Sequence, residues 1–197
     1  MIKAIIFDMG GVILISKIES GYKKLSELLN ISYEDFKEIY NLHHEDMQKG
    51  KLKVKDFIDI IKNKFNINKD IIKLWKKTYL EIMKVNQVLL DLINNLRKNY
   101  KILLLSNAPD LHYEINKERK IFSYFDDVII SCQVGLIKPE KEIFNLTLEK
   151  LKLNPEECIF IDDREEHIVP AKEMRFRTIL YRDNQQLINE LKELNIL

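Results

Sequence analysis

Five polar residues fall at the C-terminal ends of predicted strands or just beyond them: Asp8, Ser106, Lys138, Asp162 and Asp163. In an open parallel sheet these ends meet at one edge, where ligands bind. Three carboxylates gathered there repel one another unless a cation lies among them, and oxygen ligands favour a hard ion, magnesium above all. A lysine and a serine beside them would hold a phosphoryl group against a carboxylate nucleophile.

Each of these residues has a simpler interpretation when it is taken alone. Ser106 and Asn107 could cap a helix, and Lys138 could be a solvated lysine before a proline. Asp162 and Asp163 could simply turn the chain. These interpretations leave unexplained why all of the residues fall on one edge of one predicted sheet.

The first of these positions follows a short buried strand. Residues 5–7 are an uninterrupted apolar run, which is typical of a strand covered on both faces, and Asp8 ends it. Gly10 and Gly11 follow, so the backbone can turn sharply and approach a ligand.

After residue 86 the pattern alternates between helix and strand. Further strands are predicted at 101–105, 127–131, 158–161 and 178–181. This alternation predicts an α/β protein with a doubly wound parallel sheet. Pro139 is expected in the first turn of one helix, and Asp183 is expected to cap the last.

Between the first strand and this region, amphipathic helices follow one another for about seventy residues. Ser32 and Asn68 are predicted N-caps of two of them. One-faced helices with short connections predict a small bundle. We therefore expect a core of residues 1–14 and 86–197 with an inserted helical-bundle cap of residues 15–85.

Composition restricts the function classes. The chain has 197 residues, 46% of them hydrophobic and 32% charged, with a formal net charge of +1. Near-neutrality gives no indication of a nucleic-acid or anionic-membrane partner. Cys132 and Cys158 are expected as reduced thiols, and the apolar runs are too short to span a bilayer. A cytoplasmic protein with a small-molecule ligand is the expectation; the sequence does not indicate the oligomeric state.

The order of motifs resembles a known family. The segments FDMGGV (7–12), LSN (105–107), GLIKP (135–139) and IDD (161–163) resemble the four motifs of the haloacid dehalogenase-like (HAD) superfamily. The helical insert after the first motif resembles the cap of its subfamily I. The resemblance covers essentially the whole chain, and it implies a Rossmann-like core with a helical cap.

The resemblance also implies roles for residues at the phosphate. Asp8 would attack phosphorus and form an aspartyl-phosphate. Ser106 and Lys138 would bind the phosphoryl oxygens and offset charge in the transition state, with Asn107 and Gly10 close to the phosphate. Positioning and electrostatics would then do most of the catalysis, as is usual in phosphoryl transfer.

The cofactor that the resemblance implies is Mg²⁺. It would be held by Asp8, by the backbone carbonyl of Gly10 and by Asp162. Asp163 would support it, either through bound water or by orienting Lys138.

One departure from the family pattern concerns catalysis. Most family phosphatases have a second aspartate two positions after the nucleophile, as general acid and base, and this chain has Gly10 there. General acid–base catalysis is typically worth about 10²–10⁴-fold. A subgroup with the pattern Asp-x-Gly-(Gly or Asn)-Val includes sugar-phosphate phosphatases, so Gly10 does not by itself imply inactivity.

A further departure from the family pattern and several cap residues also give expectations. His167 stands where the family often has asparagine, and a role in local packing is expected. His43 lies on the apolar stripe of its helix and is expected to be packed, whereas His44 is expected to face away into solvent. Trp75 and Tyr79 belong to a helical stripe and are expected in the core, although either could line the entrance to the site.

The sequence leaves rival functions open. Gly10 favours a catalytically weak binding or regulatory module, while the five retained polar residues disfavour it. A 2-haloacid dehalogenase would use an early arginine, and the first arginine here is Arg97. Phosphonate cleavage would need a particular cap lysine. The predicted cap has many lysines, and no neighbouring residue distinguishes one of them. The favoured prediction is a magnesium-dependent phosphatase for a small phosphorylated metabolite, with sugar phosphates among the candidates.

Overall fold

The computed structural model describes residues 1–15 and 18–197, and for Ile18 it describes the backbone alone. Ser16 and Lys17, which belong to the expected cap, lie outside the described residues. A five-stranded sheet has the order β5-β4-β1-β6-β7, and all of its neighbours are parallel. Its strands are β1 (Ala4–Phe7), β4 (Lys101–Ser106), β5 (Asp127–Ile130), β6 (Cys158–Asp162) and β7 (Arg177–Leu180). The predicted α/β fold class with a doubly wound parallel sheet is confirmed.

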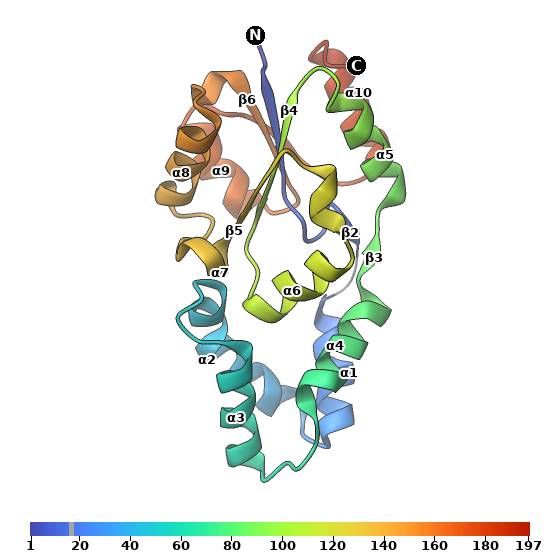
Figure 1. The fold of residues 1–197 in the computed structure, drawn as a ribbon, viewed down its shortest axis with the longest axis vertical. Helices are drawn as coiled ribbons and strands as arrows, with labels where there is room; N and C mark the ends of the chain where they lie inside the picture. The colour runs from blue at the N-terminus through green and yellow to red at the C-terminus, as the bar shows by residue number, and fades with distance from the viewer. Residues whose placement is uncertain (16–17) are drawn as a thin grey trace.

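Helices cover both faces of this sheet (Figure 1). They are α5 (Gln87–Leu96), α6 (Asp110–Glu118), α7 (Ser131–Val134), α8 (Lys141–Leu151), α9 (Glu165–Glu173) and α10 (Asn184–Glu193), with 3₁₀ turns at Ile121–Tyr124 and Pro155–Glu157. Alternate residues of β1 point to opposite faces. Ile5 and Phe7 belong to the apolar cluster that includes α5 and α10, whereas Ala4 and Ile6 belong to the cluster of α8 and α9.

The other helices form the insertion between two short strands. They are α1 (Ile18–Leu29), α2 (Tyr33–Gln48), α3 (Val54–Phe65) and α4 (Ile71–Ile82), and the antiparallel strands that frame them are β2 (Leu14–Ile15) and β3 (Lys84–Val85). Figure 1 shows these four helices at the end of the molecule opposite both termini. The division into a core and a cap at residues 15–85 stays a prediction. No helix in the described part of the chain is long and apolar enough to cross a membrane.

Several predicted boundaries were wrong by a few residues. The fourth inserted helix is capped by Asp70, whose side chain accepts from the Lys73 N–H, and not by Asn68. Pro139 was expected in the first turn of a helix but lies in the turn before α8. There the Glu140 N–H donates to the Ile137 carbonyl, and α8 begins only at Lys141. The predicted caps Ser32 and Asp183 are confirmed by bonds from the backbone N–H groups three residues later.

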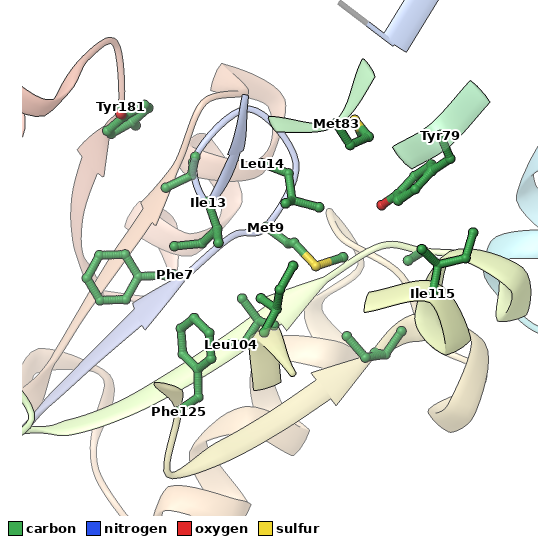
Figure 2. Close-up of a cluster of buried hydrophobic side chains, with 14 of the residues drawn as sticks. Phe7, Met9, Ile13, Leu14, Tyr79, Met83, Leu104, Ile115, Phe125 and Tyr181 are labelled. Carbon is green, nitrogen blue, oxygen red and sulfur yellow. The ribbon is translucent and has the colours of Figure 1, made fainter. Parts of the chain in front are cut away.

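The insertion packs closely on the rest of the chain. Gly50 lies in the loop between α2 and α3 with φ +70°, and a Cβ there would lie 2.2 Å from the Cys132 carbonyl oxygen of α7. Such an approach requires glycine. Figure 2 shows apolar side chains continuing from the sheet to the insertion, with Met9 and Leu14 near Met83 and Tyr79. The two parts therefore share one hydrophobic cluster.

Helix α4 carries a buried hydroxyl group that lacks a hydrogen-bond partner. Thr78 is 3% exposed, and its Oγ1 has no hydrogen-bond partner among the described residues. Because an unsatisfied buried hydroxyl costs free energy, Thr78→Val is expected to raise the free energy of unfolding by about 1 kcal/mol, measured by urea denaturation.

Thr147 provides the matched control for this substitution. Its hydroxyl is also buried but donates to the Ile143 carbonyl at 2.8 Å. Thr147→Val should therefore give no gain in stability. A loss of stability in Thr78→Val would contradict the prediction.

Candidate active site

A buried lysine lies at the centre of the site. Lys138 is 2% exposed, and its Nζ donates to Asp8 Oδ1 at 2.5 Å and to Asp162 Oδ2 at 2.6 Å. Its remaining donor reaches the Leu105 carbonyl at 2.9 Å. All three ammonium donors are thus satisfied, which a charged group needs in a buried position.

The parallel register places the two carboxylates next to each other. Phe7 of β1 pairs with Ile161 of β6, and the Asp8 N–H continues this pairing to the Ile161 carbonyl at 2.9 Å. Asp162 ends β6 one residue later. The prediction that the acidic residues converge at one edge of the sheet agrees with this geometry.

The side chain of Asn107 holds the backbone of Lys138. Its side-chain Oδ1 accepts from the Lys138 N–H at 2.9 Å, and its Nδ2 donates to the Lys138 carbonyl at 2.8 Å. The amide therefore bonds both backbone groups of Lys138. This fixes the segment that carries the ammonium, since Lys138 lies in a turn and has no sheet or helix to hold its backbone.

Ser106 is the last residue of β4, directly before Asn107, and it is 2% exposed. Its hydroxyl makes no hydrogen bond to another described residue, whereas the hydroxyl of Ser131, which follows the neighbouring strand β5 and begins α7, accepts from the Ala108 N–H at 2.9 Å. The Ser106 hydroxyl is thus the one of the two that a ligand could engage.

His167 does more than pack locally, contrary to the sequence-based expectation. It is buried on α9, and its Nδ1 lies 2.9 and 3.0 Å from the two oxygens of Asp162. The Arg164 N–H donates to Asp162 Oδ1 at 2.9 Å. Asp162 is therefore oriented from α9 as well as from Lys138. No periodicity in the sequence indicates this contact, because Asp162 ends β6 whereas His167 lies on α9.

Three carboxylates are close enough to share a metal ion. Oxygen atoms of Asp8, Asp162 and Asp163 all lie within 4.8 Å of one another. Asp163 packs on Gly11, where a Cβ would lie 2.0 Å from Asp163 Oδ2, so only glycine fits there. An all-oxygen donor set with two or three carboxylates fits Mg²⁺.

The charges of the site shift the pKa values of its carboxyls in opposite directions. Burial raises the pKa of Asp8 to about 7, opposed by Lys138 and assisted by Asp162. Burial also disfavours the charge of Asp162, but Lys138 and His167 outweigh it and lower its pKa to about 2. Burial opposes the charge of Lys138, yet the two carboxylates raise the pKa of its ammonium.

A cleft of about 500 Å³ opens above this cluster. From the sheet edge it is lined by Asp8, Gly10, Asn107 and Asp163 among others. The side of the cleft formed by the insertion comes from α1, α2 and the residue after α4: Tyr22, Tyr40, Asn41, His44, Gln48 and Met83. The inserted helices therefore cover the candidate site.

Two expectations for cap histidines had different outcomes. His43 is half-buried with its ring 5.8 Å from that of Phe57, as a packed residue would be. The orientation predicted for His44 was wrong: it is half-buried and lines the cleft. The ring of Tyr40, one turn earlier, holds it at a centroid distance of 4.9 Å.

Trp75 and Tyr79 are buried in the core, as expected. Their partner is His112 of α6, which was not among the residues predicted from the sequence. Trp75 Nε1 donates to His112 Nε2 at 3.1 Å, and the Tyr79 ring lies 4.3 Å from the imidazole. Burial lowers the pKa of His112 to about 3, so it stays neutral and accepts this bond.

The buried cluster generates a prediction for Lys138→Met. Without the ammonium, Asp162 loses its cation and Asp8 must take up a proton to stay buried, and removing one partner of a buried pair costs about 3–5 kcal/mol. We expect a loss of this size in the free energy of unfolding at pH 7 without added metal.

Lys150→Met is the matched control because Lys150 pairs with Asp127 at 3.2 Å on the surface. A surface pair contributes about 0–1 kcal/mol. Equal losses in the two variants would show that the buried cluster does not stabilise the fold.

Comparison with known proteins identifies relatives of this site. The family model of haloacid dehalogenase-like hydrolases matches residues 2–175. D-ribitol-5-phosphate phosphatase of Bacteroides thetaiotaomicron is 30% identical over 193 residues, covering 90% of this chain and 91% of that protein. A stretch of 74 residues is 42% identical to bifunctional epoxide hydrolase 2 of Rattus norvegicus; this is 38% of the present chain and only 13% of that relative.

Solved structures agree with this assignment. A HAD family enzyme from Bacteroides thetaiotaomicron, in complex with magnesium and inorganic phosphate, superposes with a TM-score of 0.82 at 25% identity. The match covers 95% of this chain and 99% of that one. Together with the family model, these likenesses show that this chain belongs to the haloacid dehalogenase-like hydrolases.

Proposed function

We propose that this protein is a magnesium-dependent phosphatase that hydrolyses a small phosphorylated metabolite through an aspartyl-phosphate on Asp8. The observation that carries the proposal is the buried Lys138, bonded to Asp8 and Asp162 beneath a cleft. Such a cluster has one cation and three carboxylates, which suits a metal and a phosphate together.

Asp8, Asp162 and Asp163 would hold Mg²⁺, with the carbonyl of Gly10 as a further oxygen ligand. The ion supplies positive charge that stabilises phosphoryl oxygens and keeps the Asp8 carboxylate ionised. Carboxylates at this spacing and the metal- and phosphate-bound HAD structure support this assignment.

In the reaction an Asp8 oxygen attacks phosphorus, and the bond to the leaving oxygen breaks. Lys138 and the Ser106 hydroxyl offset charge on the phosphoryl oxygens. Asn107 acts through its two bonds to the Lys138 backbone, which keep the ammonium in place. Water then attacks the aspartyl-phosphate, releasing inorganic phosphate and the free carboxylate.

The substrate class we favour is a phosphorylated polyol or sugar. Asn41 and Gln48 lie on the cleft-facing side of α2, and their amides make no bond to other described residues, so they can bind hydroxyl groups. The likeness to D-ribitol-5-phosphate phosphatase over nine-tenths of both chains supports the same class.

The first test is the activity of Asp8→Asn. An amide cannot act as the nucleophile, so hydrolysis of 4-nitrophenyl phosphate and of D-ribitol 5-phosphate with Mg²⁺ should fall by at least about 10³-fold. Asp59→Asn, an exposed aspartate on α3, is the matched control and should retain wild-type turnover. Absence of magnesium-dependent hydrolysis in the wild type would favour the binding or regulatory module instead.

The second test concerns the pH dependence of metal binding. The pKa of Asp8 is raised to about 7, so the metal-free protein keeps a proton on this carboxyl below that pH, and a metal must displace it. Mg²⁺ affinity should therefore weaken about tenfold for each pH unit below 7 and level off above it. Calorimetric titration between pH 5.5 and 8 measures this slope, which Asp8→Asn should flatten. A pH-independent affinity in the wild type would contradict it.

A further inference from the structure

We propose that His44 of the inserted helix α2 is the general acid and base of the reaction, in place of the side chain that Gly10 lacks. The proposal rests on the phosphatase function proposed above. It goes further by assigning the proton transfers to a residue on the opposite side of the cleft from Asp8.

The first support is position. His44 and Asp8 line the same cleft, and so do Gly10 and Gly11, which lie between β1 and β2. Asn41 and Gln48, three residues before and four residues after His44, line it too, so one face of α2 is turned toward the phosphate site. A leaving group that extends from a phosphate at Asp8 into this cleft would meet that face.

The second support is that the imidazole is held while its nitrogens stay available. Its ring packs on Tyr40 at 4.9 Å, and the Tyr40 hydroxyl in turn accepts from the Tyr22 hydroxyl at 2.5 Å. Neither nitrogen of His44 bonds another described residue. A positioned ring with free nitrogens is what a proton donor needs.

The other histidines are already engaged. His43 packs against Phe57 and does not line the cleft. His112 Nε2 accepts from Trp75, and His167 Nδ1 is bonded to Asp162. Of the chain's four histidines, His44 alone lines the cleft with both nitrogens free of bonds to the described residues.

The remaining titratable groups in the cleft are poorly suited to the task. Asp8 is the nucleophile and Asp163 lies in the carboxylate cluster. Burial raises the pKa of the Tyr22 and Tyr40 hydroxyls, which keeps both protonated and makes them weak acids. This leaves an imidazole, whose ordinary pKa lies closest to neutral pH.

The charges around His44 allow it to gain a proton when substrate binds. Burial and Arg164 lower its pKa, while Glu45 on the same helix raises it; His112 faces it from α6. A phosphate dianion in the cleft adds negative charge and raises the imidazole pKa again. Substrate binding and protonation of His44 therefore favour each other.

The proton transfers balance over one cycle. In the first step Asp8 forms the new oxygen–phosphorus bond, the ester oxygen–phosphorus bond breaks, and the leaving oxygen takes a proton from the His44 imidazolium. In the second step neutral His44 takes a proton from water as the water oxygen bonds phosphorus. The Asp8–phosphorus bond then breaks, and His44 is again protonated.

The test compares two leaving groups in His44→Gln. Because kcat/KM covers only the steps up to transfer of phosphate to Asp8, it reports the acid role alone. For 2-glycerol phosphate, whose alkoxide needs a proton, kcat/KM should fall about 10²-fold or more. For 4-nitrophenyl phosphate, whose leaving group needs none, it should change by less than about threefold.

A second readout reports the base role. Without a base for water, the aspartyl-phosphate should accumulate in His44→Gln, giving a burst of 4-nitrophenol equal to the enzyme concentration, followed by slow turnover. His43→Gln is the matched control on the neighbouring position, and it should show neither the selective loss nor the burst.

The outcomes separate this inference from the proposed function. Equal losses with both esters, or no loss with either, would overturn the role of His44 while leaving the phosphatase intact. If the wild type hydrolyses neither ester with Mg²⁺, the proposed function itself fails. Retained activity of His44→Gln toward 4-nitrophenyl phosphate also shows that the variant is folded.

Discussion

The structure depends on one buried positive charge. The Lys138 ammonium is enclosed by two carboxylates and a carbonyl, and each of these groups would be costly to bury without it. The same arrangement leaves the site with an excess of negative charge, because Asp163 joins Asp8 and Asp162. A divalent cation relieves that excess, and a phosphate group then brings negative charge back to the Lys138 ammonium and the metal. Structural stability and ligand binding therefore rest on the same few atoms.

The fold holds this cluster by several independent means. Parallel pairing of β1 with β6 sets Asp8 and Asp162 side by side, because both follow a shared register. Lys138 lies in an irregular turn, so its position is set by the side-chain amide of Asn107. His167 fixes the far side of Asp162. A rigid sheet edge thus supplies the carboxylates, and hydrogen bonds from the loops and α9 supply the rest.

The difference between residues placed by strands and residues placed by loops and helices explains how much the sequence could predict. Strand ends follow from short apolar runs, so the convergence of Asp8, Ser106 and Asp162 at one edge was predictable without coordinates. Helix rotation is harder: a stripe on α2 placed His43 correctly, but the same reasoning turned His44 toward solvent. It failed because α2 packs on the other inserted helices with one face and lines the cleft with another. A single apolar stripe indicates only the packed face. The cap at Asp70 in place of Asn68 reflects the usual uncertainty of helix ends.

In the proposed mechanism, the helical insertion supplies what the glycine two positions after Asp8 cannot. Gly10 gives backbone but no side chain to the cleft, and the proton donor proposed above, His44, comes from the opposite wall. That wall is joined to the sheet by the paired linkers β2 and β3, and the Asn86 amide ties the second linker to the Val12 carbonyl, to Tyr181 and to Asn184. Trp75 and His112 hold α4 on α6. An acid carried by α2 can be effective only if these contacts keep α2 in place over Asp8. If His44 transfers the proton as proposed, the packing between the insertion and the sheet is part of the catalytic machinery.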